Sequence, residues 1–219
     1  MIFTCNFCLD LHGVTIKLDF IATILVNTKE ASMIVLLSGF MGAGKSSLLS
    51  KLRRNSSAAD QFSLLDLDEE VERNCRKSIS QLVEKNGWEY FRKIEKNLFY
   101  KLCNSRSNLV VALGGGTLDA VQIQNLRANN NIVIIWLNTP FNVCLARILS
   151  EKNNRPLAQE DAGMLERLYE NRLKTYKQCD IGLNVEDQEK INGVDDILNL
   201  ISNRLKTSNF VKCNYDLNL

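Results

Sequence analysis

Short apolar runs alternate with segments of helical periodicity through the middle of the chain. The first run, 33–38, is continuous and ends at Gly39, and each later run follows a helical segment. Continuous apolar strands are typical of a parallel sheet that is covered on both faces, and the helices between them imply right-handed crossovers. We therefore expect a three-layer α/β fold around a central five-stranded parallel sheet. The strands are expected at 33–38, 62–66, 108–113, 132–137 and 181–185.

The segments between these runs carry apolar residues three and four positions apart, as helices do. The long segment from Asp68 to Cys103 has two expected breaks, at Lys77–Ser78 and at Asn86–Gly87. Pro140 suits the first turn of a later helix, because that position needs no backbone N–H. Helices are thus expected before 55, over 68–103 with these breaks, at 121–127, from 140 to 149, at 164–176 and at 197–205.

The two ends of the chain differ from this alternating body. Residues 1–32 precede the first strand and are followed at once by Met33. We interpret them either as an N-terminal extension or as the product of a wrongly chosen upstream start codon. The domain itself is expected over 33–203. Residues 204–219 are expected to form a C-terminal tail, which is loose and rich in Asn from Ser208 onward.

Charge and composition narrow the class of protein. The chain has 219 residues, with 27 Lys and Arg against 25 Asp and Glu and a formal charge of +2. This balance excludes the strongly basic field of a general nucleic-acid binder. No apolar run reaches the roughly eighteen residues of a membrane helix, and the start of the chain lacks the positive region of a signal peptide. The seven cysteines are expected to stay reduced, which is typical of the cytoplasm. We therefore predict a cytoplasmic protein with no nucleic-acid or membrane partner.

One motif points directly to a nucleotide. The segment Gly39–Ser46 has a glycine, four residues, and then Gly-Lys-Ser, and it lies between an expected strand and an expected helix. Such a loop aims backbone N–H groups at a polyphosphate, and the helix adds its positive N-terminal end. Lys45 is expected to reach the β- and γ-phosphates and Ser46 to ligate Mg²⁺. The loop alone does not distinguish a kinase from a nucleotide-hydrolysing switch.

Two carboxylates follow the second expected strand. Asp66 and Asp68 lie at the carboxyl edge of the sheet, where ligands bind in parallel α/β folds. Alternation along an extended chain puts both on one side, so one can serve the metal and the other an acceptor hydroxyl. The alternative is that Asp68 is only a helix cap. That alternative leaves Asp66 unexplained.

The segment Gly114–Gly116 follows the third strand and favours a place where a ligand touches backbone N–H groups. A flexible turn is the alternative. Three arginines, Arg92, Arg155 and Arg172, complete the candidate set, and Arg92 has a partner for an ion pair one helical turn away at Glu95. No rule of spacing separates them from solvated surface charges.

Taken in order along the chain, these motifs resemble those of the shikimate kinases. The resemblance covers roughly 33–203 and implies a P-loop kinase fold similar to that of nucleoside monophosphate kinases. It also implies that ATP phosphorylates the 3-hydroxyl of shikimate, in the pathway to chorismate and aromatic amino acids. The motifs are Gly-Phe-Met-Gly-Ala-Gly-Lys-Ser (39–46), Asp-Leu-Asp (66–68), Phe-Arg-Lys-Ile-Glu (91–95), Leu-Gly-Gly-Gly-Thr (113–117), Arg-Pro-Leu (155–157) and Glu-Asn-Arg-Leu-Lys-Thr-Tyr (170–176).

The resemblance assigns a role to single residues of the acceptor site. Arg92 and Arg172 hold the carboxylate of shikimate, for which bidentate guanidinium contacts are suited. Asp68 binds ring hydroxyls and is the candidate base. The shikimate-binding residues are then Asp68, Arg92, Gly115 and Arg172.

The resemblance also assigns the nucleotide side. Ser46 ligates Mg²⁺ directly and Asp66 through water, while Arg147 lies beside the adenine. A lid over 151–161 carries Arg155, which closes on the phosphates and stabilises charge during transfer. Lys45, Asp68 and Arg155 are therefore the expected catalytic residues. The ATP-binding residues are Gly42, Ala43, Gly44, Lys45, Ser46, Ser47 and Arg155.

Some features depart from the family pattern. Ser47 stands where the family often has Thr, and the segment after Val185 lacks a proline that is usual where adenine binds, which makes the nucleotide preference less defined. The extension carries Cys5-x-x-Cys8 with His12, the only histidine, but a closed zinc site needs four ligands. Two other functions stay open, a kinase of another small molecule such as gluconate or a nucleoside monophosphate, and a non-catalytic module. The family resemblance suggests a monomer.

Overall fold

The computed structural model describes residues 32–55, 61–150 and 161–215, with side chains described as far as 204. Residues from Ser32 onward form one unit that contains every described element. The expected extension, residues 151–160 of the expected lid, and Arg155 within them lie outside the described residues. The site is therefore built from the remaining elements.

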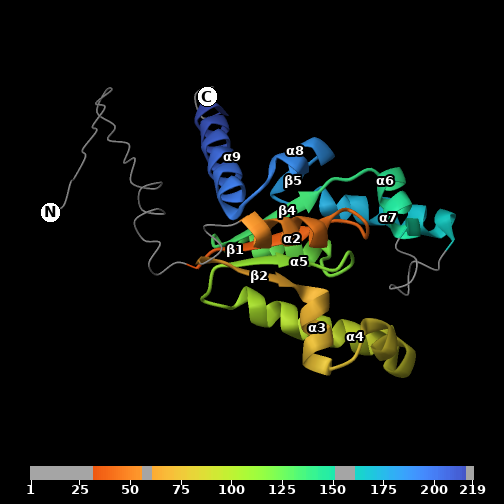
Figure 1. Cartoon of the computed structure of the whole chain (residues 1–219). Coiled ribbons are helices and arrows are strands. Elements are labelled where there is room, and N and C mark those ends of the chain that lie inside the picture. Colours follow the sequence, from red (N-terminus) through yellow and green to blue (C-terminus); the bar gives the residue numbers. More distant parts are fainter. Residues whose placement is uncertain (1–31, 56–60, 151–160, 216–219) are drawn as a thin grey trace, which may run out of the picture. The chain divides into compact units, whose positions relative to one another are not determined.

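The sheet has five parallel strands in the order β2-β3-β1-β4-β5 (Figure 1). The prediction of a five-stranded parallel sheet is thus confirmed, and no strand bound differs from the prediction by more than two residues. β3 pairs in parallel with both β1 and β2. The carboxyl ends of β1, β2 and β3 therefore lie at the same edge of the sheet. The strands are β1 (Ile34–Ser38), β2 (Ser63–Asp66), β3 (Leu109–Ala112), β4 (Ile132–Leu137) and β5 (Ile181–Leu183).

Both faces of the sheet are covered. Ile34 and Leu36 of β1 pack into one core with α4 and α5, whereas Val35 and Leu37 pack into the other with α2, α6 and α9. This two-sided burial is the reason that the strands read as continuous apolar runs. The helices are α2 (Lys45–Asn55), α3 (Leu67–Cys75), α4 (Ile79–Cys103), α5 (Ala120–Arg127), α6 (Phe141–Ser150), α7 (Ala162–Tyr176), α8 (Val185–Lys190) and α9 (Val194–Tyr215).

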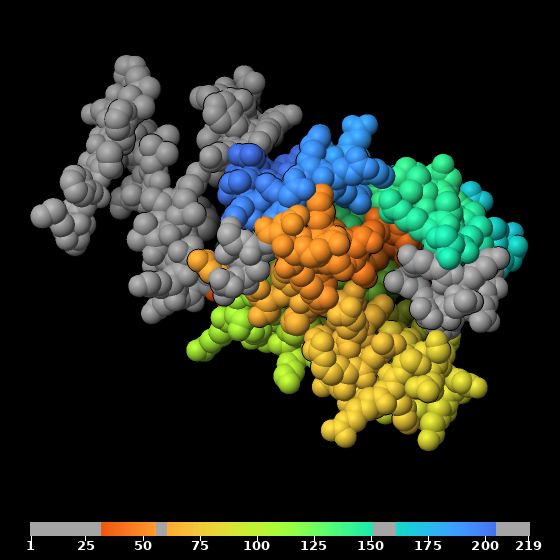
Figure 2. Space-filling view, viewed as in Figure 1, coloured from red at the N-terminus to blue at the C-terminus, as the bar shows by residue number. Residues whose placement is uncertain are grey.

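Helices α3 and α4 form an arm beside the carboxyl edge of the sheet, amber to olive in Figure 2. The expected break between them is confirmed, because Arg76 takes a left-handed conformation and Ser78 caps α4 in a capping box with Gln81. The second expected break is also confirmed, since Gly87 has a φ of 81° and kinks α4. The arm has a small apolar core of its own around Val71, Leu82 and Phe91.

The C-terminal elements differ from expectation. A short helix, α8, begins directly after β5, where Asn184 caps it by accepting a hydrogen bond from the N–H of Asp187 at 2.8 Å. Helix α9 continues to Tyr215, so the expected loose tail from Ser208 is wrong for the residues as far as 215. Asp196 stabilises the start of α9 by accepting from the N–H groups of Asn192 and Gly193. Asparagine is common both in loops and at helix N-caps, so the sequence did not reveal the Asn184 cap of α8.

Two further observations concern the described residues. No helix among them combines the length with the apolar character that crossing a bilayer requires. Their four cysteines, Cys75, Cys103, Cys144 and Cys179, all carry free thiols.

Candidate active site

The segment 39–46 joins β1 to α2 and forms a phosphate loop. Gly42 and Gly44 have φ values of 74° and 103°, in the left-handed region that favours glycine. A Cβ on Gly42 would lie 2.6 Å from the carbonyl oxygen of Cys144, so close packing against α6 also requires glycine there. The expected loop between strand and helix is confirmed. Its Gly42, Ala43 and Gly44 lead directly into Lys45, Ser46 and Ser47 at the start of α2.

Lys45 lies within the loop instead of extending into solvent, with 8% of its surface exposed. Its Nζ donates to the carbonyl oxygens of Gly39 at 2.7 Å and Phe40 at 2.9 Å. A buried ammonium needs such partners, because burial without them is costly. The contacts place a positive charge where the loop encloses phosphate groups.

Residues from the other half of the sheet support the back of this loop. The hydroxyl of Thr139, a residue only 2% exposed, donates to the carbonyl of Ala43 at 2.9 Å. Arg147 of α6 donates from Nη1 to the carbonyl of Gly42 at 3.0 Å. Gln188 of α8 donates to Thr139 Oγ1 at 3.2 Å, which links the segment after β5 to the phosphate loop. The sequence did not predict this contact of Arg147 with the loop, and its position beside the adenine stays a prediction.

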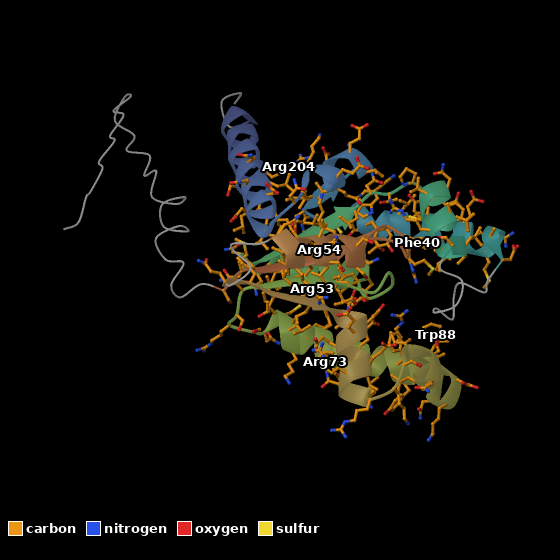
Figure 3. All side chains as sticks on the ribbon, viewed as in Figure 1. Phe40, Arg53, Arg54, Arg73, Trp88 and Arg204 are labelled. Atoms are coloured by element: carbon orange, nitrogen blue, oxygen red, sulfur yellow. The ribbon has the colours of Figure 1, made fainter. Side chains whose placement is uncertain are left out.

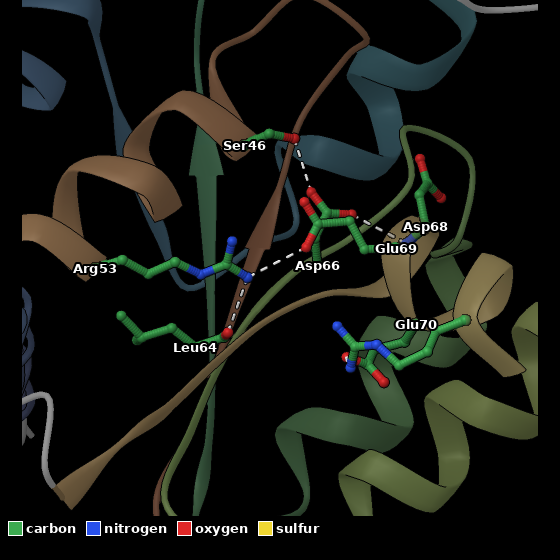
Figure 4. A network of polar contacts seen from close by, with 8 residues as sticks. Ser46, Arg53, Leu64, Asp66, Asp68, Glu69 and Glu70 are labelled. Carbon is green, nitrogen blue, oxygen red and sulfur yellow. Dashed lines mark hydrogen bonds and ion pairs between the residues drawn. The ribbon is translucent and has the colours of Figure 1, made fainter.

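The two carboxylates lie at the end of β2 and in the first turn of α3, and Asp66 is the one that caps this helix (Figure 4). Asp66 caps α3 by accepting from the N–H of Asp68 at 3.0 Å, so the reading of Asp68 as the cap is wrong. The other oxygen of Asp66 accepts from Ser46 Oγ at 2.8 Å. The chain is already helical at Leu67, so Asp68 shares a pocket with Asp66 through the helix turn and not through strand alternation.

The rim of this carboxylate cluster is held by Arg53 of α2 (Figure 4). Its Nη2 donates to the carbonyl of Leu64 at 3.1 Å and to Glu69 at 3.3 Å. Both side chains of the ion pair are exposed, so its contribution to stability is small. Its effect is to tie α2 to β2 and the first turn of α3.

Arg92 of α4 is anchored by a buried carboxylate. Its Nη1 lies 2.5 Å from Oε2 of Glu95, and Glu95 is only 2% exposed. The second carboxylate oxygen, Oε1, accepts from the hydroxyl of Thr117 at 2.6 Å. The guanidinium carbon also lies 5.6 Å from the ring centre of Trp88 and 5.1 Å from that of Phe91. Ion pair and aromatic contacts together orient this guanidinium.

Arg172 of α7 lines the same pocket as Arg92. Burial lowers its pKa from the ordinary value, and nearby Arg92 lowers it further, while Tyr176 and Glu95 oppose the change. Its guanidinium carbon lies 5.7 Å from the ring centre of Phe40 in the phosphate loop. Figure 3 labels Phe40 on the loop and Trp88 on α4, the rings beside Arg172 and Arg92 respectively. Two cations thus line the same pocket, an arrangement suited to an anionic ligand.

The three glycines after β3 are crowded by charged side chains. A Cβ on Gly116 would lie 2.7 Å from Arg172 Nη2, and one on Gly115 would lie 3.1 Å from Arg172 Nη1. A Cβ on Gly114 would lie 2.8 Å from Glu95 Oε1. The segment does form a turn, in which the N–H of Thr117 donates to the carbonyl of Gly114 at 3.2 Å. The end groups of Glu95 and Arg172 would have to move aside for a side chain at Gly114 or Gly116.

A pocket of about 440 Å³ brings these residues together at the carboxyl edge of the sheet. Of the residues predicted from the sequence, it is lined by Ser46, Asp66, Asp68, Arg92, Gly114, Gly115, Gly116 and Arg172. A second hollow of about 500 Å³ is lined by Ile123, Gln124, Arg127 and Gln178, none of which belongs to the phosphate loop or to the predicted site. Ligands of parallel α/β folds bind at the carboxyl edge, which favours the first pocket.

Sequence reasoning missed several supporting residues. Thr117 and Tyr176 belong to the motifs that signalled the family, but spacing alone assigned neither a role. Gln188 lies in the segment after Val185 that departs from the family pattern, and its contact with Thr139 depends on folding. No group of three or more His, Cys, Asp or Glu capable of holding a metal occurs within the described ranges. The motif Cys5-x-x-Cys8 and His12 lie outside them.

This fold and site define an ATP-dependent phosphotransferase of the P-loop kinase class. A family model described as Shikimate kinase matches residues 41–202. A shikimate kinase of Persephonella marina is 32% identical over 168 residues, which cover 76% of this chain and 98% of that protein. The chain belongs to the shikimate kinase family.

Solved structures agree with this assignment. The crystal structure of shikimate kinase from Aquifex aeolicus matches with a TM-score of 0.62 at 29% identity, covering 80% of this chain and 98% of that one. The shikimate kinase of Acinetobacter baumannii, solved in complex with shikimate, matches with a TM-score of 0.59 at 28% identity, covering 84% and 97%. The expectation that the fold is a P-loop kinase fold is confirmed.

Proposed function

We propose that the protein transfers the γ-phosphoryl group of ATP to the 3-hydroxyl of shikimate, giving shikimate 3-phosphate and ADP in the synthesis of chorismate and aromatic amino acids. The observation that carries this proposal is the meeting of Arg92, Arg172 and Asp68 in one pocket with Ser46 and Asp66. A monoanionic polyol needs cations for its carboxylate and an acceptor for its hydroxyl protons. A phosphate loop at the same edge supplies the donor.

In this proposal, the carboxylate of shikimate binds to Arg92 and Arg172. Glu95 holds Arg92 in place and Phe40 lies beside Arg172, so both guanidinium groups are oriented before the ligand arrives. Orientation in advance reduces the entropy that binding must overcome. Gly115 lies beside Arg172, and we propose that its backbone completes the acceptor site.

Asp68 is the proposed base. It lines the pocket in the first turn of α3, where Asp66 holds its backbone N–H. From this position it binds the acceptor hydroxyl and takes its proton as the bond to phosphorus forms. Lys45 and Arg155 are proposed to balance the charge that develops on the transferred group.

The donor set at Ser46 and Asp66 fits Mg²⁺. The two side chains are in contact at 2.8 Å and offer hydroxyl and carboxylate oxygens, the ligands that this ion prefers. We propose that Ser46 ligates the ion directly and Asp66 through water. When bound, Mg²⁺ neutralises oxygens of the β- and γ-phosphates. Asp66 is held on both oxygens, so it is oriented for this task.

Three further expectations belong to this proposal. The segment 151–161 closes as a lid that excludes water, since an open site would lose ATP to hydrolysis. The protein acts as a monomer. It acts in the cytoplasm, where reduced thiols such as the four described ones are usual.

The test is release of ADP by the full-length protein with Mg-ATP, using shikimate, gluconate and a panel of nucleoside monophosphates as acceptors. We expect turnover with shikimate alone and its loss in Lys45→Ala and Asp68→Asn. The matched controls are Lys101→Ala and Asp195→Asn, which alter exposed residues of α4 and α9 and should leave turnover unchanged. Turnover with gluconate or a nucleotide in place of shikimate would overturn the proposed substrate. Nucleotide binding without any turnover would favour a non-catalytic module.

A further inference from the structure

Tyr176, the last residue of α7, has a buried hydroxyl with no assigned role in the reaction. The residue is 2% exposed, and its ring stacks on Trp136 of β4 with centres 6.1 Å apart. Its hydroxyl donates to the carbonyl oxygen of Gly115 at 2.6 Å. The packing of the ring needs no hydroxyl. The short hydrogen bond therefore calls for a separate explanation.

Arg172 lies one helical turn earlier on α7, close enough for its guanidinium to favour the charged form of the Tyr176 hydroxyl and so to oppose the rise in pKa that burial causes. A guanidinium carries only donors, and a phenol can accept one hydrogen bond while donating another. The Tyr176 hydroxyl can therefore serve Arg172 as an acceptor while it donates to the carbonyl of Gly115. Burial raises the pKa of Tyr176 well above its ordinary value, so the phenol keeps the proton that it donates.

Gly115, which accepts the hydrogen bond from Tyr176, also lies against the phosphate loop. A Cβ at Gly115 would lie 3.3 Å from the N of Met41 and 3.4 Å from the carbonyl oxygen of Gly39. The same Cβ would lie 3.1 Å from Arg172 Nη1. The backbone of Gly115 is therefore confined between Arg172 and the phosphate loop. The hydrogen bond from Tyr176 holds its carbonyl group.

We propose that Tyr176 is a positioning residue. It orients Arg172 and the backbone of Gly115 so that both can contact the carboxylate of the acceptor. This inference rests on the proposed function, because it assumes an anionic acceptor in the pocket. Without the hydroxyl, Arg172 keeps its charge but loses the contact that aims it. Gly115 loses the only described side-chain donor to its carbonyl. Acceptor binding is then weakened, while the phosphate loop and Lys45 stay in place.

The test is Tyr176→Phe in the full-length protein, which removes the hydroxyl and keeps the ring on Trp136. We expect the KM for shikimate to rise about tenfold, as for the loss of a hydrogen bond to a charged group. The KM for ATP and kcat should change less than about twofold. The matched control is Tyr169→Phe on the same helix, whose hydroxyl donates to Thr139 at 3.1 Å on the loop side. We expect it to leave the KM for shikimate unchanged.

A purely structural role would give a different pattern. Partial unfolding of Tyr176→Phe lowers kcat through the active fraction and leaves both KM values unchanged, and this result would overturn the inference. A second measurement uses Arg172→Lys alone and with Tyr176→Phe, with shikimate affinity measured by calorimetry. If Tyr176 acts through Arg172, its loss costs little in the Arg172→Lys background. Additive losses would contradict the inference. Wild-type protein that turns over no shikimate would instead sink the proposed function itself.

Discussion

Arg92 Nη1 lies 2.5 Å from Glu95 Oε2, one helical turn further along α4. The carboxylate is buried and the guanidinium is partly exposed at the pocket. The two residues therefore have different tasks. The buried Glu95 holds Arg92, and Arg92 is the residue that is exposed to a ligand in the pocket. The spacing of the two residues in the sequence allowed the contact, and the fold placed it at the site.

Glu95→Gln should raise the KM for shikimate about tenfold and change the KM for ATP little. The amide keeps an acceptor for Thr117, but it loses the charge that anchors Arg92. Steady-state kinetics with each substrate varied in turn measure the effect. Glu89→Gln, at an exposed position of the same helix, is the control. Equal KM values in Glu95→Gln and wild type would show that the rings of Trp88 and Phe91 suffice to orient Arg92.

Gly116→Ala should weaken acceptor binding by about tenfold or more, because its Cβ would displace Arg172 Nη2 from a distance of 2.7 Å. The same Cβ would lie 3.3 Å from Arg92 Nη2, so both guanidinium groups are affected. Calorimetric titration with shikimate measures the affinity. Gly193→Ala meets only the carbonyl of Asn55, at an ordinary 3.6 Å, and should bind as wild type does. Similar affinities for the two variants would contradict the crowding seen at Gly116.

Ser46→Ala should raise the Mg²⁺ concentration needed for half-maximal turnover about tenfold or more, because it removes a proposed ligand and the partner of Asp66. Turnover at saturating ATP over a range of Mg²⁺ measures this requirement. Ser50→Ala, at an exposed position of the same helix, serves as the control. An unchanged requirement in Ser46→Ala would exclude this hydroxyl as a ligand.

The free energy of unfolding should fall as the pH rises above 9. Burial raises the pKa of Cys103 to about 12 and that of Cys144 to about 11, and Lys45 and Arg147 oppose the change at Cys144. Between pH 9 and 11 the unfolded chain releases thiol protons that the folded chain retains. The stabilisation from these thiols is thus complete below pH 9 and is lost toward pH 11, by the order of 1 kcal/mol for each thiol at pH 10.

Urea denaturation at pH 8 and pH 10 tests this dependence. The difference between the two pH values should be smaller in a Cys103→Ala, Cys144→Ala variant than in wild type, whatever the stability of the variant at pH 8. Other groups also titrate in this range, so the comparison between the two proteins carries the result. An equal fall in both proteins would assign the dependence to those other groups.

The alternation of apolar runs and helical segments determined the architecture. A strand that is buried on both faces is apolar at nearly every residue. The number, direction and approximate bounds of the strands could therefore be predicted from the sequence. The breaks at Ser78 and Gly87 were also predictable, because a capping residue and a glycine in a left-handed conformation act locally. Helix α8 was missed because its Asn184 cap resembles a loop residue.

For the site, the sequence by itself determined the phosphate loop, because its chemistry lies in contiguous backbone and one lysine. The resemblance of linked motifs added Asp68, Arg92, Gly115 and Arg172. Only the tertiary structure decided how these residues act together. Glu95 and Arg172 fill the space above the three glycines, Asp66 rather than Asp68 caps α3, and Tyr176 connects α7 to Gly115. Such contacts join residues from different elements, and their distances are set by the packing of helices on the sheet, which no local pattern encodes.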